Sequence, residues 1–141
     1  MSHIIDDEIR ERLDKISAQM RRNYNELLRE INLHVGQDHL LCLLWTKDGL
    51  TQVQICEHLN CEPPTVTNMV KALEQKGFVY RQKDKNDGRI SRIYLTPEGR
   101  DLENPVTERW RKQQEKLLKG ILPEERLLLR RLLKQMEENL F

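Results

Sequence analysis

The sequence predicts a mainly α-helical protein of one domain, residues 1–141, in which short helices and one β-hairpin lie between long terminal helices. A chain of 141 residues is long enough for one domain. Aromatic residues make up 5% of it and charged residues 33%, which is typical of helical rather than β-rich proteins. Apolar residues recur at helical spacing near both ends, and an Asp-Gly turn separates two strand-like segments between them.

The first two helices are expected over residues 5–31 and 37–47. In the first, apolar residues recur at steps of three and four and so fall on one face, opposite a charged face. The second is rich in leucine and ends near Asp48-Gly49, a pair that breaks helices. The apolar stripe of the first helix is formed by Ile5, Ile9, Leu13, Ile16, Met20, Tyr24, Leu27 and Ile31.

The third and fourth helices are expected after this break. Thr51 and Gln54 are three residues apart, the spacing of a capping box at the start of a helix. The fourth helix starts at Pro63 or Pro64, because the first turn of a helix tolerates residues without an N–H group. The sequence leaves the choice between the two prolines open. Gly77 is expected to end this helix, as glycine commonly does.

A β-hairpin is expected next, with strands over residues 78–82 and 91–95 and a charged tip over residues 83–90. The hairpin holds five basic residues and two acidic ones, whereas the whole chain has a net charge of only +1. A local basic patch of this kind is enough to steer binding to a DNA backbone, even in a nearly neutral protein.

Two helices are expected after the hairpin. Thr96 and Pro97 have the pattern of an N-cap and a first helical residue, which predicts a long helix to about residue 119. Pro105 lies inside this helix, so a kink is expected there. The last helix is expected to start at Leu122-Pro123, and its apolar face is formed by Leu128, Leu129, Leu132, Leu133, Met136 and Leu140.

This order of elements is that of a winged helix-turn-helix lobe over residues 37–99. The flanking helical regions, residues 1–36 and 100–141, each have an apolar face that so small a lobe cannot cover. The simplest partner for these faces is a second copy of the chain. We therefore expect a homodimer in which both flanking regions form the interface.

Residues 50–99, LTQVQICEHLNCEPPTVTNMVKALEQKGFVYRQKDKNDGRISRIYLTPEG, resemble the MarR family of bacterial transcriptional regulators. The resemblance is carried by Leu50-Thr51, by TVT and LE.KG in the fourth helix, by DGR in the hairpin, and by LT..G after it. It implies a cytoplasmic homodimer that binds double-stranded DNA at a palindromic operator, by default as a repressor. It also implies that a small aromatic or phenolic ligand releases the protein from DNA.

The fourth helix has one apolar side, and its opposite, polar side can enter a major groove. There an asparagine can pair with adenine, a threonine can bond a base or pack on a thymine methyl group, and a lysine can reach guanine or phosphate. An ordinary solvated helix face is the alternative interpretation. The predicted DNA-binding residues of this recognition helix are Pro64, Thr65, Thr67, Asn68, Lys71 and Gln75.

The hairpin, which we call the wing, can lie along the adjacent minor groove, where the negative potential suits an arginine. Arg89 at the tip is the candidate, and Asp87 can hold its guanidinium in place by a charge-assisted hydrogen bond. The resemblance implies the same roles for this acid and this arginine. A solubilising loop is the alternative. Phosphate contacts, which position without specifying, are expected from Arg81, Lys83, Lys85 and Arg92.

Three cysteines allow a second interpretation, a thiol-based redox-sensing regulator. Peroxide sensors of the resembled family carry their reactive cysteine near the start of the first helix, and residues 1–36 contain none. We therefore interpret Cys42 and Cys56 as core residues and keep Cys61 as the redox candidate. A third interpretation is a winged-helix module that binds another protein, which predicts a neutral recognition face and a short or acidic wing.

Other classes of site have weaker support. His34 and His39 lack the i, i+4 spacing of a helical metal pair, so we expect no metal and no cofactor. No Gly-rich phosphate loop or Ser/His/Asp arrangement stands out, so an enzyme is not expected. No apolar run approaches the ~20 residues of a membrane helix, and an odd number of cysteines suits a reduced cytoplasm. The candidate ligand-lining residues are Tyr24, His39, Leu43, Trp45 and Trp110.

Overall fold

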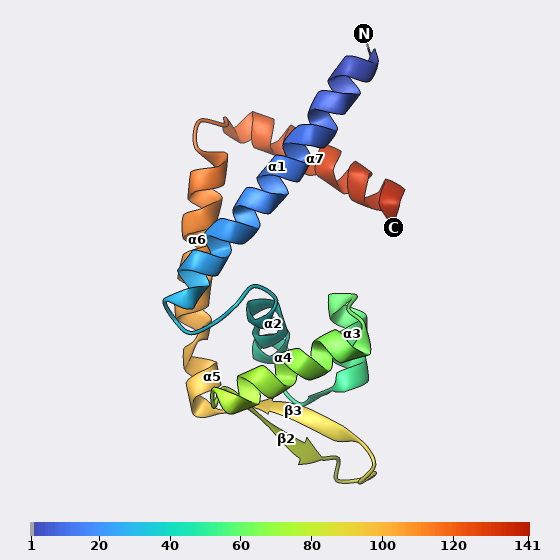
Figure 1. Ribbon diagram of the computed structural model, residues 1–141, viewed down its shortest axis with the longest axis vertical. Coiled ribbons are helices and arrows are strands. Elements are labelled where there is room, and N and C mark those ends of the chain that lie inside the picture. The colour runs from blue at the N-terminus through green and yellow to red at the C-terminus, as the bar shows by residue number, and fades with distance from the viewer. Residues whose placement is uncertain (1) are drawn as a thin grey trace.

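The computed structural model of the protein describes residues 2–141 and divides into a helical part and a lobe. Figure 1 shows the long helices α1, α6 and α7 together, with both chain ends on their side, and the hairpin at the opposite end of the molecule. The mainly helical, winged helix-turn-helix prediction is confirmed. The helices are α1 (Ser2–Arg29), α2 (Gln37–Thr46), α3 (Gln52–Leu59), α4 (Pro63–Gln75), α5 (Pro97–Asp101), α6 (Glu103–Leu118) and α7 (Pro123–Leu140), and the strands are β1 (Leu50–Thr51), β2 (Val79–Lys83) and β3 (Ser91–Leu95).

The helix-turn-helix starts and ends as its sequence predicts. The hydroxyl oxygen of Thr51 accepts a hydrogen bond from the Gln54 N–H at 3.2 Å, and the Gln54 side-chain oxygen accepts one from the Thr51 N–H at 2.9 Å. This reciprocal capping box starts α3. Helix α4 starts at Pro63, which settles the choice between the two prolines. After its end, Gly77 has a φ of 80°, in the left-handed region that favours glycine.

The hairpin belongs to a three-stranded antiparallel sheet with strand order β1-β3-β2. Leu50 of β1 lies opposite Ile93, and Val79 of β2 lies opposite Leu95. Sequence analysis did not predict β1, because a strand of two residues has no alternation of apolar and polar side chains to detect. The consequence for the site is that the base of the wing is hydrogen-bonded to the segment just before α3.

The expected long helix after the hairpin is interrupted, but not at the expected position. Thr96 caps α5 by accepting a hydrogen bond from the Gly99 N–H at 3.1 Å, as predicted. Helix α5 ends at Asp101 and α6 starts at Glu103, so the break lies at Leu102 and not at Pro105. A proline ring clashes with the carbonyl group four residues earlier, which is that of Asp101. The proline therefore breaks the helix one turn upstream of itself.

The hydrophobic core lies in the lobe. Its fully buried residues come mainly from α2, α3, α4 and the sheet, and Leu28 of α1 and Val106 of α6 extend it towards the helical part. The core therefore fixes the position of α4, whose Val66, Val70 and Leu73 are completely buried. The other fully or nearly fully buried apolar residues are Leu33, Leu40, Leu41, Leu44, Leu50, Ile55, Val79, Ile93 and Leu95.

The α1 stripe from Ile5 to Ile16 and most of the α7 stripe remain exposed in one copy of the chain. Ile5 of α1 is 59% exposed and Leu127 of α7 is 59% exposed, and no residue of α7 is buried. Figure 1 shows α7 crossing α1 far from the lobe. Within residues 2–141, no helix combines the length and the apolar character needed to cross a membrane.

Candidate nucleic-acid interface

Helix α4 presents a polar face on the surface of the lobe. Its apolar side is anchored in the core, as predicted, and this orients the opposite side outwards. The predicted DNA-binding residues of this helix are exposed except for Thr67, which is half-buried. The exposed members are Pro64, Thr65, Asn68, Lys71 and Gln75.

Thr67 is engaged inside the helix-turn-helix. Its hydroxyl group donates to the carbonyl oxygen of Pro63 at 2.9 Å and accepts a short hydrogen bond from the side-chain amide of Gln52. Gln52 is the first residue of α3, so this bond joins the two helices of the motif. Gln52 was not predicted from the sequence, because its position beside the polar side of α4 depends on a contact between residues fifteen positions apart.

The far end of α4 is held by two side-chain contacts. The Lys76 ammonium group donates to the Gln37 side-chain oxygen at 3.1 Å, and burial lowers the pKa of this lysine. Arg81 of β2 donates to Glu74 at 2.7 Å, with both side chains about one-third exposed. Arg81 was predicted to contact phosphate, but here its charge is paired with an acid of α4. This pair connects the recognition helix to the wing.

The base of the wing is braced by Asp84, which sequence analysis did not single out. One carboxylate oxygen accepts from Arg92 at 2.6 Å, and the other accepts from the backbone N–H groups of Asn86 and Asp87, each at 3.0 Å. Arg92 also donates to the carbonyl oxygen of Gly49 at 2.9 Å. The hydrogen bond from Arg92 is the main reason why the pKa of Asp84 is lowered. Arg92 therefore stabilises the base of the wing by joining Asp84 to Gly49.

Arg89 is presented at the wing tip by Asp87, as the sequence predicts. The guanidinium group donates to both carboxylate oxygens, at 3.1 and 3.3 Å, and the Arg89 backbone N–H donates to the same carboxylate at 3.0 Å. These hydrogen bonds lower the pKa of Asp87. The Arg89 side chain is nevertheless 91% exposed. It is therefore oriented from one side and accessible to a ligand from the other.

The five basic residues of the wing fall into two groups. Arg81 is paired with Glu74 of α4, and Arg92 is paired with Asp84 at the base of the tip. Lys83 and Lys85 are exposed and form no ion pair with any residue of the described chain, 2–141, and Arg89 keeps most of its surface free. The free positive charge is therefore concentrated at the tip of the wing.

A cavity of about 610 Å³ lies between the helical part and the start of α4. Of the five residues predicted to line a ligand site, His39 is the one that lines it. Arg21 of α1 is on the cavity wall, as are His58 of α3 and Thr65 of α4, which sequence analysis did not connect. The full lining is Arg21, Val35, Gly36, His39, His58, Leu59, Cys61, Thr65 and Met69.

The other predicted lining residues do not line this cavity. The Trp45 indole N–H donates to the Gly99 carbonyl oxygen, and that of Trp110 donates to Asp38, each at 2.9 Å. Trp110 also stacks on His39, with ring centroids 6.0 Å apart. The other two, Tyr24 and Leu43, are half-buried, and burial raises the pKa of the Tyr24 hydroxyl.

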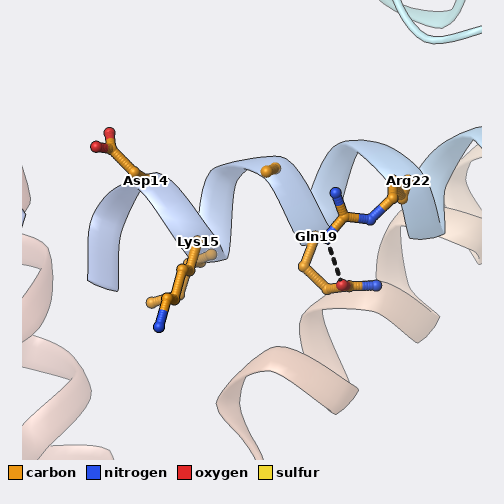
Figure 2. A pocket seen from close by; sticks show the side chains of 6 residues that line it. Asp14, Lys15, Gln19 and Arg22 are labelled. Carbon is orange, nitrogen blue, oxygen red and sulfur yellow. Dashed lines mark hydrogen bonds between the residues drawn. The ribbon is translucent and has the colours of Figure 1, made fainter. Parts of the chain in front are cut away.

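A hollow on the side of α1 is a poor candidate for a site. Figure 2 shows a hollow on the side of α1, where Arg22 donates to Gln19 at 2.7 Å and where Asp14 and Lys15 also contribute. All its lining residues come from one helix, so it is an open part of the exposed stripe rather than an enclosed site.

Across residues 2–141, no three His, Cys, Asp or Glu side chains are grouped so that they could hold a metal ion.

Comparisons with known proteins agree with this fold. The model of the MarR family matches residues 33–91. The organic hydroperoxide resistance transcriptional regulator of Bacillus subtilis (strain 168) is 35% identical over 83 residues, which span 59% of this chain and 56% of that protein. The HTH-type transcriptional regulator YwoH of the same organism is 30% identical over 114 residues, 81% of this chain and 82% of YwoH. The crystal structure of an S. aureus MepR–DNA complex, 29% identical, covers 90% of this chain and 94% of that one with a TM-score of 0.83.

Proposed function

This chain belongs to the MarR family, and from that premise we propose that it is a homodimeric, DNA-binding transcriptional repressor. It occupies a palindromic operator and is released by a small-molecule ligand. The observation that carries the proposal is the wing tip, where Asp87 orients the exposed guanidinium group of Arg89. The similarity to MepR, which has been crystallised with DNA, supports the same use of this surface.

In the proposed complex, α4 enters the major groove and the wing follows the adjacent minor groove. Asn68 and Lys71 are exposed in the middle of the helix and are suited to reading base edges. Arg89 enters the minor groove, where an arginine is favoured by the negative potential. Lys83 and Lys85 contact phosphate groups, because they are exposed and carry uncompensated charge. Arg81 and Arg92 have a structural role first, since their charges are already paired.

The proposed dimer buries the exposed stripes of α1 and α7. The groove between α6 and α7 is lined by apolar residues that include Leu117 and Leu133, and by three bases, Arg126, Arg130 and Lys134, with one acid, Glu137. Residues 6–14 of α1 hold five acids and two bases around an exposed apolar stripe. We therefore place α1 of the second copy over the α6–α7 groove of the first. Apolar contact and opposite charge then favour the same arrangement.

Two-fold symmetry of this dimer requires a palindromic operator. The two copies of α4 reach successive major grooves on one side of the duplex, so the half-sites are about one helical turn, 10–10.5 base pairs, apart. A bound dimer covers the operator and blocks access to a promoter there, which is why we propose repression. Such a protein acts where the bacterial chromosome lies, in the cytoplasm.

The ligand that releases the protein is proposed to bind in the cavity beside α4. Its volume of about 610 Å³ lies within the ~300–1,000 Å³ typical of small-molecule sites. Val35, Leu59 and Met69 provide apolar contact for an aromatic ring, and Arg21 provides charge for a phenolate. The cavity wall joins α1 to the first turn of α4. A ligand there changes the position of α4 relative to the dimer helices and so the distance between the two half-sites.

The proposal is tested by selecting DNA from a random pool with the full-length protein and titrating the selected sequence at several salt concentrations. Phosphate contacts release counterions, so the logarithm of the affinity should fall steeply as the logarithm of the salt concentration rises. The selected sequences should contain an inverted repeat. The interpretation as a protein-binding winged helix gains support if no sequence is enriched and if residual DNA binding is weak and independent of sequence.

A further inference from the structure

Two of the three thiols lie at the two ends of one turn, directly before the recognition helix. Helix α3 ends with Asn60 in the left-handed region, at a φ of 52°. The carbonyl oxygen of Cys56 accepts hydrogen bonds from the backbone N–H groups of Asn60 and Cys61, the latter at 3.2 Å. In this type of helix ending, the side chains of the two outer residues commonly touch. Here both outer residues are cysteines.

The backbone of this turn keeps the two cysteines within reach of a disulfide. With 3.2 Å between the Cys56 oxygen and the Cys61 nitrogen, standard bond lengths limit the separation of the two α-carbons to about 7.4 Å along a straight path. A bent path makes it shorter, and disulfides span about 4.4–6.8 Å between α-carbons. Both cysteines are half-buried and pack against the same core.

We propose that Cys56 and Cys61 form a dithiol pair that hydrogen peroxide or an organic hydroperoxide converts into a disulfide within one chain. Cys61 reacts first because it lines the cavity and is reached from solvent. Its sulfur attacks one peroxide oxygen, the O–O bond breaks, and a sulfenic acid forms as water or an alcohol leaves with the thiol proton. Cys56 then attacks the sulfenic sulfur, the S–S bond forms, and a second water leaves. The peroxide takes up the two electrons that the two thiols lose.

The third thiol provides an internal control. Cys42 lies in α2, on another element, and burial followed by the nearby charges of Asp38 and Glu103 raises the pKa of its thiol. Because the thiolate is the reactive form, Cys42 is expected to remain reduced under conditions that oxidise the pair.

The disulfide changes the turn that leads into α4. The Cys61 thiol now makes a weak hydrogen bond to the Leu59 carbonyl oxygen at 3.5 Å, and this bond is lost when its hydrogen is removed. The two sulfurs must come to about 2.05 Å from each other, closer than two thiols in contact. Only Glu62 separates Cys61 from Pro63, the first residue of α4, so the shift reaches the start of the recognition helix. This consequence for DNA rests on the proposed function, whereas the formation of the bond does not.

The bond is tested by mass spectrometry, because one tryptic peptide, residues 48–71, contains both Cys56 and Cys61, while Cys42 lies in another. After peroxide treatment and alkylation, that peptide should be lighter by two hydrogens and carry no alkyl group, with Cys42 still alkylated. Cys42→Ser should give the same product, whereas Cys56→Ser should leave a sulfenic acid at Cys61 that dimedone traps. Free thiols on the peptide, a bond between two chains, or oxidation unchanged in Cys61→Ser would overturn the proposal.

The regulatory consequence has its own measurement. Oxidised protein should bind its selected DNA about fivefold or more weakly than reduced protein, the lower end of typical coupling between sites. Dithiothreitol should restore the affinity, and Cys56→Ser, whose melting temperature is checked in parallel, should lose the effect. Equal affinity of the oxidised and reduced forms would reject a role in DNA binding. Failure of the reduced protein to bind any DNA would reject the proposed function and leave the mass result standing.

Discussion

Arg89 and Arg92 lie three residues apart on the wing, yet their surroundings give them different tasks. Arg92 donates to Asp84 and to the carbonyl oxygen of Gly49, so its charge is already paired within the fold. Arg89 is held only by its neighbour Asp87, and 91% of its side chain remains exposed. A guanidinium group that is oriented in advance loses less freedom on binding. This difference predicts that, of these two arginines, only Arg89 helps to distinguish one DNA sequence from another.

Replacing Arg89 by alanine should therefore weaken binding to the selected operator by about 1–3 kcal/mol, the range for a specific arginine contact. The melting temperature should not change, because an exposed tip side chain buries little surface. Asp87→Ala should give a smaller loss of the same kind, since Asp87 only orients the arginine. The measurement is a titration on operator and on random DNA. Unchanged operator affinity in Arg89→Ala would contradict the minor-groove role.

Lys83→Ala is the matched control for this experiment. Lys83 is an exposed cation of the same wing without an acidic partner among the described residues. Its loss should weaken binding to operator and random DNA equally and reduce the salt slope by about one unit. If Arg89→Ala behaved in the same way, Arg89 would be another phosphate contact.

The acid at the base of the wing predicts a pH dependence. Hydrogen bonds, first from Arg92 and then from two backbone N–H groups, keep the pKa of Asp84 below its usual value. Because the folded-state pKa is the lower one, the brace stabilises the wing fully above the unfolded value of about 3.9. The contribution disappears as the pH falls through the folded-state pKa. DNA binding near neutral pH should thus be insensitive to this group.

Arg92→Ala should raise the pKa of Asp84 towards the usual value, because it removes the largest of these hydrogen bonds. A titration of the side-chain carboxyl carbons by NMR measures the shift directly. Arg100→Ala is the control, since Arg100 pairs with Asp48, outside the brace. An Asp84 pKa that stayed equally low in Arg92→Ala would show that the backbone N–H groups alone set it.

At the scale of the elements, the features that were predicted correctly from the sequence are those that depend on residues close together in the chain. The Thr51–Gln54 capping box and the apolar side of α4 depend on residues within one or two turns, and both are observed. Strand β1 exists only because it pairs with β3, which lies some forty residues later, and the contact between Gln52 and Thr67 depends on the packing of two helices. The cavity beside α4 also joins distant segments, which is why sequence reasoning named only one of its lining residues.

The joint between the hairpin and α5 depends on a glycine. A Cβ atom at Gly99 would collide with the carbonyl oxygen of Phe78, a backbone atom that cannot rotate away. The Gly99 carbonyl oxygen also accepts the Trp45 indole hydrogen bond. Gly99→Ala should therefore lower the stability by about 1–3 kcal/mol or more, as overpacking does. Thermal unfolding tests this, with Gly88→Ala as the control because a Cβ atom there would meet nothing within 4 Å. Equal melting of the two variants would argue against a tight joint.

At the scale of the whole molecule, the core and the proposed dimer interface occupy separate parts of the chain. The buried apolar residues of the core all lie between Leu28 and Val106, and no residue of α7 is among them. Helix α7 therefore contributes little to the core of one copy, and its leucines Leu127, Leu128 and Leu140 remain 59%, 54% and 84% exposed. We propose that a second chain covers the exposed parts of the terminal helices and thereby stabilises them.

Deleting residues 124–141 should consequently abolish the dimer and leave a monomer or an aggregate, while the lobe keeps its core. Leu128→Glu combined with Leu132→Glu is a milder test, because these two leucines lie four residues apart on one face of α7 and are 54% and 36% exposed. The double variant should sediment as a monomer and lose cooperative binding to the inverted repeat, because buried charges without partners oppose association. Arg131→Glu, an exposed change on the same helix, serves as the control and should remain dimeric. A truncated chain that sedimented as a well-folded dimer would refute the proposed interface, since the contact between copies would then have to lie elsewhere.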